Sequence, residues 1–280
     1  MRTVTRASEL SRAPQGTRAV VMTMGALHGG HLALVRHARA IADEVLVTLF
    51  VNPLQFDDPA DLEGYPRTLD ADSALLEAEG VDILYAPDVD DVYPGGTPIV
   101  TVSAGAISDV FEGASRPGHF DGVLTVVLKL MHLTRPDVAV FGEKDAQQVI
   151  AVRTMVRDLN VPVEIAVAPT VRDDDGLARS SRNVFLSPGE RADALVLSRA
   201  LFAADAAARW GAAVPEALRA GAEVLASVPS ARVEYFAALD PLSAQPVRGD
   251  YRGEVVIAVA ARVGKTRLID NVSSHIARER

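Results

Sequence analysis

Short runs of continuous apolar residues alternate, between residues 18 and 170, with stretches in which apolar residues recur every three or four positions. The runs are typical of buried β-strands, and the stretches are typical of amphipathic helices. Repeated strand–helix–strand units predict an α/β fold, in which a parallel sheet carries helices on both faces. Predicted strands cover residues 19–24, 45–51, 81–85, 138–141 and 163–167, and predicted helices cover residues 31–42, 69–79, 122–133 and 144–159.

The pattern changes after residue 171. A charged segment comes first, and two alanine-rich helical stretches and three candidate strands follow it. Helices followed by a run of strands predict a smaller α+β domain. We therefore expect two domains, 1–170 and 171–280. The predicted elements of the second domain cover residues 188–210, 215–227, 232–239, 254–262 and 266–270.

Composition and charge narrow the classes of function. The chain has 280 residues, of which 49% are apolar and 23% charged, and its net charge is -9. This acidic balance provides no basic field for nucleic acid. The chain has no cysteine, which excludes disulfides and thiol nucleophiles. The opening residues contain no apolar leader, and the longest apolar run, 45–51, is too short to span a bilayer. We therefore expect a cytoplasmic protein that binds neither nucleic acid nor membrane.

A glycine-rich segment with two histidines follows the first predicted strand. Ligands of parallel sheets bind beyond the carboxyl ends of the strands, and helix N-termini attract phosphate groups. Gly25, Gly29 and Gly30 let the backbone approach a ligand, and His28 and His31 can donate hydrogen bonds to it. A glycine-rich turn with incidental histidines explains the segment equally well when it is taken alone.

Polar residues also follow two other predicted strands. Asn52 and Gln55 come after the run 45–51, where an ordinary Asn-Pro turn is the favoured explanation of these residues alone. Lys144, Asp145 and Gln148 come after the strand 138–141. The helical spacing of Asp145 and Gln148 predicts that both face inward, and the lysine suits phosphate. A capping turn at a helix N-terminus is the alternative.

A fourth cluster lies in the charged segment. Ser180 and Ser181 stand between Arg179 and Arg182, and hydroxyl and guanidinium groups suit phosphate oxygens. A solvated linker is the better explanation of this cluster alone. Among the other histidines, we expect His119 to belong to a site. We expect surface or terminal positions for His37, His132 and His275.

Taken together, the clusters resemble the pantothenate synthetase family. This family belongs to a nucleotidyltransferase superfamily with Rossmann-like cores and with HIGH-type and KMSKS-type motifs. The segment His28-Gly29-Gly30-His31 is similar to the HIGH element, and Arg179-Ser180-Ser181-Arg182 is similar to the KMSKS element. Further segments match in family order: TMGALH–GH, FVNPLQF, YPRT, RPGHF–GV, FGEKD–QQ, DGLA–SSRN and RLIDN.

The resemblance implies an activity. Members ligate pantoate and β-alanine to pantothenate through a pantoyl-adenylate intermediate, with ATP as co-substrate and magnesium as cofactor, and they are usually homodimers. A nucleotidyltransferase that adenylates a phosphate-bearing acceptor is the alternative, since it shares the HIGH-type logic. A tRNA-aminoacylating relative and a non-catalytic nucleotide-binding module are further alternatives, and the acidic net charge opposes the first of these.

The resemblance also implies roles for individual residues. His31, His28 and Lys144 would be catalytic, and Gln55 and Gln148 would bind pantoate with support from Asn52 and Arg116. No metal ligand is assigned to the protein. The nucleotide would be bound by Met24, Gly25, Ala26, Leu27, His28, Gly29, Gly30, His31, Gly142, Glu143, Lys144, Asp145, Val171, Arg179, Ser180, Ser181 and Arg182.

Four positions depart from the usual family pattern. Met22 stands where proline is usual, Gly29 where an acidic residue is common, and Ala146 where an aromatic residue is usual. Arg179 stands where an apolar methionine or leucine is common, and it adds charge near the expected phosphate groups. The two histidines, both glutamines and Lys144 are intact, so we expect activity to be retained.

Overall fold

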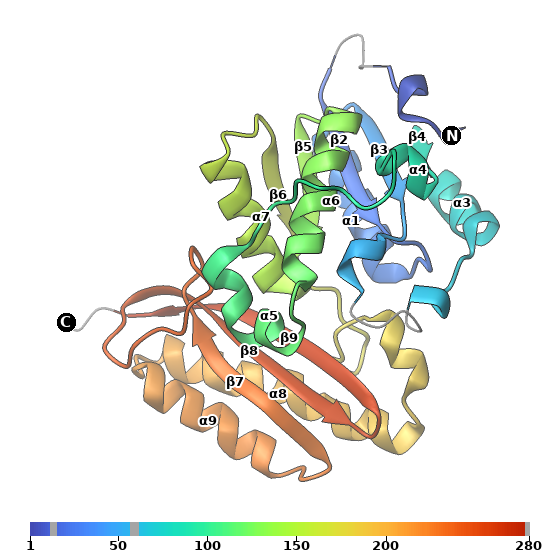
Figure 1. Cartoon of the computed structure of the whole chain (residues 1–280). Helices are drawn as coiled ribbons and strands as arrows, with labels where there is room; N and C mark the ends of the chain where they lie inside the picture. The colour runs from blue at the N-terminus through green and yellow to red at the C-terminus, as the bar shows by residue number, and fades with distance from the viewer. Residues whose placement is uncertain (12–15, 57–61, 278–280) are drawn as a thin grey trace. The chain divides into compact units, whose positions relative to one another are not determined.

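The computed structural model describes residues 1–11, 16–56 and 62–277. Contacts between residues divide the chain into two compact units. The first comprises Met1–Gly142 and Ala151–Pro169, and the second comprises Glu143–Ile150 and Thr170–Arg280. Each unit has a sheet of its own (Figure 1). The short segment 143–150 therefore belongs with the C-terminal unit, although it follows a strand of the first.

The sheet of the first unit has six strands in the order β1-β4-β3-β2-β5-β6. Every neighbouring pair is parallel, which confirms the predicted parallel sheet. All five strands predicted for this part of the chain are present. The strands are β1 (Arg2–Val4), β2 (Arg18–Thr23), β3 (Glu44–Leu49), β4 (Ile83–Tyr85), β5 (Val138–Gly142) and β6 (Glu164–Ala168).

Helices α1 (Gly29–Ile41) and α3 (Leu69–Ala78) cover one face of this sheet. Val35 and Ala38 of α1 and Leu76 of α3 are buried in one cluster with alternate residues of the strands, such as Val21 and Val47. The intervening strand residues, such as Val20, point to the other face of the sheet and are equally buried. Strands buried on both faces explain why they occur in the sequence as unbroken apolar runs.

Two longer helices belong to the opposite face. These helices are α6 (His119–Thr134) and α7 (Ala146–Asp158). From β2, the connections through α1 and α3 lead toward β4, whereas those through α6 and α7 lead back across the sheet toward β6. Right-handed crossovers then place α6 and α7 on the other face, and α6 packs against β2. This confirms the prediction of helices on both faces.

Shorter elements connect the strands and helices. They are the 3-10 helices η1 (Ala7–Glu9), η2 (Pro53–Gln55), η3 (Gly105–Asp109), η4 (Glu143–Asp145) and η5 (Ser181–Phe185), and the short helices α4 (Val89–Val92) and α5 (Phe111–Ser115). The apolar pattern does not predict them as separate elements, because turns of this length have no buried stripe of their own, and it assigned residues 144 and 145 of η4 to the helix 144–159. Helix α6 also begins three residues earlier than predicted, so His119 lies inside it and is buried.

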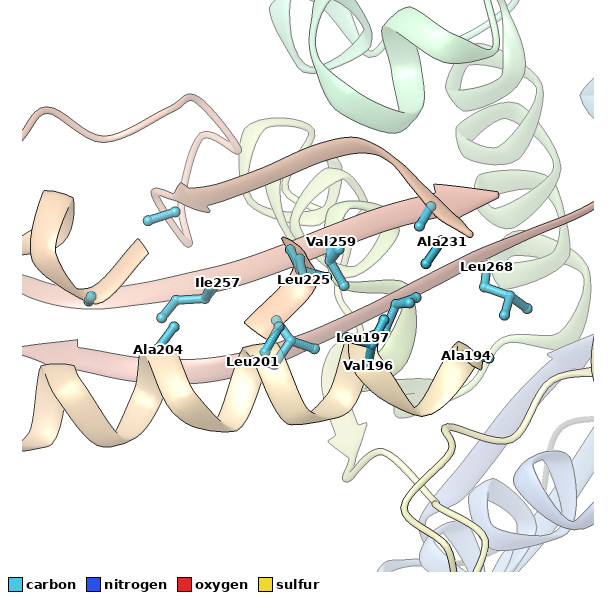
Figure 2. Close-up of a cluster of buried hydrophobic side chains, with 14 of the residues drawn as sticks. Ala194, Val196, Leu197, Leu201, Ala204, Leu225, Ala231, Ile257, Val259 and Leu268 are labelled. Carbon is cyan, nitrogen blue, oxygen red and sulfur yellow. The ribbon is translucent and has the colours of Figure 1, made fainter. Parts of the chain in front are cut away.

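The second unit contains an antiparallel sheet, β7-β8-β9, formed by β7 (Ala231–Leu239), β8 (Gly253–Val263) and β9 (Thr266–Ile276). Helices α8 (Pro188–Arg209) and α9 (Val214–Ala226) pack on this sheet, as predicted for an α+β unit. Leu197 and Leu201 of α8 meet Ile257 and Val259 of β8 in its core (Figure 2).

Strand β9 is longer than the predicted strand, which ended at Asp270. Its second half contains Asn271 and Ser274, which are polar yet buried, as is Asp270. Polar residues interrupt the apolar pattern that predicts a strand, so the predicted strand ended before the real one. Each of these three side chains makes a specific hydrogen bond inside the unit.

Among the described residues, no helix is both long and apolar enough to cross a membrane.

Candidate active site

The loop after β2 is held by a buried carboxylate. Gly25 and Ala26 have φ values of +86° and 52°, in the left-handed region that residues with a side chain seldom adopt. The Asp72 carboxylate, on α3 and only 2% exposed, accepts the backbone N–H groups of Ala26 at 3.0 Å and Leu27 at 2.8 Å. It also accepts the hydroxyl of Thr68 at 3.0 Å. The aspartate therefore fixes a loop conformation that the backbone alone disfavours.

Two histidines cap the helix that follows this loop. His28 is the N-cap of α1, and its Nδ1 accepts the backbone N–H of Gly30 at 3.1 Å. His31 lies three residues later, and its Nδ1 accepts the backbone N–H of His28 at 3.3 Å. The ring centroids are 4.1 Å apart. The two imidazoles therefore lie together at the N-terminus of the helix.

The capping bonds determine which ring nitrogens carry hydrogen. A nitrogen that accepts a hydrogen bond cannot carry a proton, so each neutral ring carries its proton on Nε2. His28 and His31 thus each have a donor on the side away from the backbone that they cap. Protonating Nδ1 of either ring would remove an acceptor from the helix N-terminus. The helix dipole adds a positive potential at this position, so the two rings and the N-terminus together favour an anion.

A second cluster surrounds Asn52, which is 1% exposed. Its Oδ1 accepts the Tyr93 hydroxyl at 2.8 Å and the Leu54 backbone N–H at 3.3 Å. Its Nδ2 donates to the Gly122 carbonyl and to Oε1 of Gln55, both at 3.1 Å. Burial raises the pKa of the Tyr93 phenol, so it remains a donor. All four partners agree on one orientation of the Asn52 amide.

Gln55 is oriented in turn by its neighbours. Because Oε1 accepts from Asn52, its Nε2 is directed to the sulfur of Met24, at 3.0 Å. Its backbone carbonyl accepts Nη2 of Arg116 at 3.3 Å and lies 3.0 Å from Nδ1 of His119. The Arg116 guanidinium also lies 3.0 Å from Nε2 of His119, which fixes that ring as the neutral Nδ1–H form. Arg116 and His119 therefore position Gln55 through its backbone.

Close packing holds the Gln55 turn against α6. A Cβ atom built on Gly122 would overlap the backbone carbonyl of Leu54. Only glycine allows the helix to approach η2 this closely. Glycine at this position is thus a requirement of the Asn52 cluster.

The loop after β2 lies beside the end of β5. Strands β2 and β5 are neighbours, with Val21 opposite Val140, and β5 ends at Gly142. The chain order reverses between these two strands, since β3 follows β2 on one side and β5 lies on the other. Ligands of open α/β sheets bind at such a switch point. The sheet thus places the loop after β2 beside the strand end at Gly142, the first residue of the second predicted nucleotide segment.

The rest of the third predicted cluster belongs to the second unit. Lys144 lies in η4 and is half-buried, and its Nζ pairs with the Asp145 carboxylate at 3.3 Å. The backbone carbonyls of Glu143 and Lys144 accept Nδ2 of Asn271 at 3.0 and 2.7 Å. One carboxylate oxygen of Glu143 accepts the Ser273 hydroxyl at 2.8 Å, and the other accepts the Thr170 backbone N–H at 3.3 Å.

The prediction that Asp145 faces inward is wrong. Asp145 is exposed, Gln148 is half-buried, and Gln147 is the buried glutamine, at 5% exposure. The helical spacing fails because α7 begins only at Ala146. Asp145 lies in the 3-10 turn before it, where the angular step between residues differs.

The charged segment forms a short hairpin rather than an open linker. Arg172 pairs with Ala178 in an isolated bridge, and the Arg179 N–H donates to the Val171 carbonyl at 2.9 Å. Ser180 then caps η5 by accepting the Arg182 N–H at 3.3 Å. All the predicted residues of this segment lie at or beyond the end of the hairpin.

Arg179 is engaged at the base of this hairpin. Its Nε lies 2.7 Å from Asp173, and Arg191 lies 2.8 Å from the other oxygen of that carboxylate. The guanidinium of Arg191, with that of Arg179, holds the pKa of Asp173 below its usual value. The arginine that departs from the family pattern thus has an ion pair within its own loop.

Three site residues were missed from the sequence: Asp72, Tyr93 and Asn271. Each acts through a contact with a residue at least 40 positions away along the chain, and none lies in a run of chemistry-bearing residues. Two signals were available, and both concern Asn271 alone: the family-like segment RLIDN, which ends at this residue, and the polar positions inside the otherwise apolar strand β9.

The fold and the site define a class. A parallel sheet with a glycine-rich, histidine-capped helix N-terminus at its switch point is typical of nucleotide-binding α/β enzymes. The sequence profile of the pantoate-beta-alanine ligase family matches residues 1–273. The chain belongs to this family.

Individual members of the family are similar to this chain along nearly the whole length of both proteins. A pantothenate synthetase of Thermobifida fusca (strain YX) is 56% identical over 279 residues, covering 96% of this chain and 94% of that protein. The crystal structure of pantothenate synthetase from Thermus thermophilus is similar with a TM-score of 0.90 and 48% identity, covering 99% of this chain and 100% of that one. The ligase from Francisella tularensis, complexed with beta-gamma ATP and beta-alanine, has a TM-score of 0.77 and 34% identity, covering 97% of each chain.

Removing the Asp72 carboxylate tests its hold on the loop. Asp72→Ala leaves two backbone N–H groups without their acceptor, and we expect the free energy of unfolding to fall by about 1–3 kcal/mol. Urea denaturation measures the change. Asp70→Ala, which removes an exposed carboxylate from the first turn of the same helix, is the matched control. Equal stability of the two variants would show that Asp72 does not hold the loop.

Proposed function

We propose that this chain ligates pantoate and β-alanine to pantothenate, with ATP as co-substrate and pantoyl adenylate as the intermediate. The observation that carries the proposal is the match of the ligase family along residues 1–273, with a pair of imidazoles at the N-terminus of α1. A helix N-terminus whose two capping imidazoles keep Nε2–H donors directed away from the cap suits an anionic triphosphate.

The reaction needs two displacements. A carboxylate oxygen of pantoate attacks the α-phosphorus of ATP, and the bond between that phosphorus and the bridging oxygen breaks, which releases pyrophosphate. The amine of β-alanine then attacks the carbonyl carbon of the mixed anhydride. The carbon–oxygen bond breaks, AMP leaves, and the new amide nitrogen loses a proton. Neither step requires a covalent bond to the protein, so positioning and charge stabilisation supply the catalysis.

The phosphate groups of ATP need donors and positive charge. In our proposal His28 and His31 donate from Nε2, because their Nδ1 atoms are engaged in the helix cap. Lys144 supplies an ammonium group, and it is one of three lysines in a chain whose other basic residues are arginines. Ser180, Ser181 and Arg182 act on the same triphosphate. Such groups stabilise the charge that develops on the departing pyrophosphate.

The other predicted nucleotide contacts are part of the proposal. The backbone of Met24, Gly25, Ala26 and Leu27, held by Asp72, approaches ATP together with Gly29 and Gly30. Gly142, Glu143, Asp145 and Val171 contact the nucleoside. The ion pair of Arg179 with Asp173 supports a loop-holding role for this arginine, in place of a direct phosphate contact.

Two neutral amides are assigned to pantoate, Gln55 and Gln148. The orientation of Gln55 supports this assignment, because its N–H₂ group is the end left by the Asn52 hydrogen bond and can donate to a hydroxyl or carboxylate oxygen. Asn52 and Arg116 hold the turn that carries it. A neutral amide suits a small hydroxy acid better than the phosphate of a phosphate-bearing acceptor. The alternative nucleotidyltransferase reaction is therefore disfavoured.

Magnesium is assigned to the triphosphate. Within the described residues, no three His, Asp or Glu side chains converge on a point where they could hold a metal ion. Mg²⁺ commonly keeps several waters and binds through substrate phosphates. In our proposal the ion therefore arrives with ATP and is held mainly by its phosphate oxygens. When bound, the ion neutralises phosphate charge. The homodimeric state and the cytoplasmic location also stay predictions.

The proposal is tested by supplying and omitting substrates. We expect the purified chain to form AMP and pantothenate from ATP, pantoate and β-alanine with magnesium present. Without β-alanine, pyrophosphate release should stop after about one equivalent of enzyme-bound adenylate, because the second displacement lacks its amine. Chromatography of the nucleotides and a pyrophosphate assay measure both outcomes. Formation of ADP, or no dependence on pantoate, would refute the proposed reaction.

Single substitutions test the phosphate contacts. We expect His31→Ala and Lys144→Ala each to lower the single-turnover rate of adenylate formation at least about a hundredfold, the scale of losing one transition-state donor. Rapid-quench measurement with excess enzyme gives this rate without product release.

Matched controls lie outside the site. His37→Ala changes a histidine further along α1, and Lys265→Ala changes the exposed lysine of the β8–β9 turn. We expect both to keep the wild-type rate. Wild-type rates in His31→Ala or Lys144→Ala would remove those residues from the catalytic assignment.

A further inference from the structure

The turn that carries Lys144 is held by one side chain of the C-terminal sheet. Nδ2 of Asn271, in β9, donates to the backbone carbonyls of both Glu143 and Lys144, at 3.0 and 2.7 Å. Asn271 is only 3% exposed, and β9 packs along η4. The hydrogen bonds are made to consecutive carbonyls, so they fix the orientation of the peptide unit from which the Lys144 side chain projects.

The chemistry of the contact selects asparagine. A primary amide nitrogen carries two hydrogens, one for each of the two carbonyls. The Asn271 Oδ1 is buried and has no hydrogen-bond partner among the described residues. Native proteins seldom leave a buried oxygen in this state, and each case calls for an explanation. Here the two N–H donors of the amide explain why an asparagine is buried at this position although its oxygen is unpaired. No other neutral side chain of this length provides two donors.

The preceding residue ties a second segment to the same place. The Asp270 carboxylate, 4% exposed, accepts both terminal nitrogens of Arg172 at 2.6 and 3.0 Å. It also accepts the backbone N–H of Asn271 at 2.8 Å. Arg172 begins the hairpin that leads to Arg179 and the serines beyond it. A bidentate arginine–carboxylate pair has a fixed geometry.

We propose that Asn271, braced by Asp270, is a positioning residue for Lys144 in the adenylation step. The pair connects one strand to the η4 turn, which carries Lys144, and to the hairpin that leads to the proposed phosphate-binding residues Ser180 to Arg182. This inference rests on the proposed function, because it assigns Asn271 a role through the ammonium group of Lys144. In this proposal Asn271 acts on the reaction only through the turn that carries Lys144.

The test is Asn271→Asp, which keeps the size of the side chain and replaces both donors by acceptors facing two carbonyls. We expect single-turnover adenylate formation to slow by about ten- to a hundredfold, the scale of a small misplacement of a catalytic group. The decisive readout is a double-mutant cycle with Lys144→Ala. If Asn271 acts through Lys144, adding Asn271→Asp to Lys144→Ala should change the rate less than about twofold.

The control is Ser274→Ala, in the same strand. Ser274 is also buried, and its hydroxyl donates to Asp205 at 2.8 Å, away from η4. We expect this variant to lower the melting temperature of the protein while keeping the wild-type rate of adenylate formation. A rate loss that follows the melting temperature in both variants would reduce Asn271 to a structural residue and overturn the proposal.

The outcomes separate this inference from the function that it rests on. Wild-type protein that forms no AMP refutes the proposed function. An active wild type with an equally active Asn271→Asp variant refutes the positioning role alone. A loss by Asn271→Asp that persists in full in the Lys144→Ala background also refutes it, because the asparagine would then act independently of the lysine.

Discussion

The buried carboxylate of Asp72 is the constraint on which the first half of the site depends. It holds two backbone N–H groups of a loop that contains a left-handed alanine, and so it sets the entry of the chain into α1. The helix N-terminus is then capped by His28 and His31, whose ring tautomers follow from the cap. In the proposed function, the same two rings meet a structural requirement of the helix and a chemical requirement of the phosphate site.

The same principle recurs around Gln55 and Lys144. In each place a buried asparagine, Asn52 or Asn271, uses its amide to orient the segment that carries the functional group. Amides serve this purpose because they offer donors and an acceptor without a charge that burial would penalise. Around Gln55 and Lys144 the group that orients the functional segment is thus a neutral amide, whereas at the first loop it is the Asp72 carboxylate.

Much of the fold could be predicted from the apolar pattern, because strands buried on both faces leave unbroken runs. The sequence did not predict β1, because a strand of three residues is too short to show a pattern. The predicted strand for β9 was too short because buried polar residues interrupt its apolar pattern. The candidate site residues could be proposed from the sequence because they follow the ends of predicted strands, and their roles stay predictions. Asp72 and Asn271 could not, because their roles depend on contacts with residues 45 or more positions away. The misplacement of Asp145 came from treating a 3-10 turn as the first turn of a helix.

The central claim is that a carboxylate oxygen of pantoate attacks the α-phosphorus of ATP at this site. Pantoate labelled with ¹⁸O in its carboxylate tests it most directly. When the amine displaces AMP, the bridging oxygen leaves with the phosphate, so mass spectrometry should find one ¹⁸O atom in each AMP formed. Unlabelled AMP, with the label in inorganic phosphate or pyrophosphate, would contradict the account.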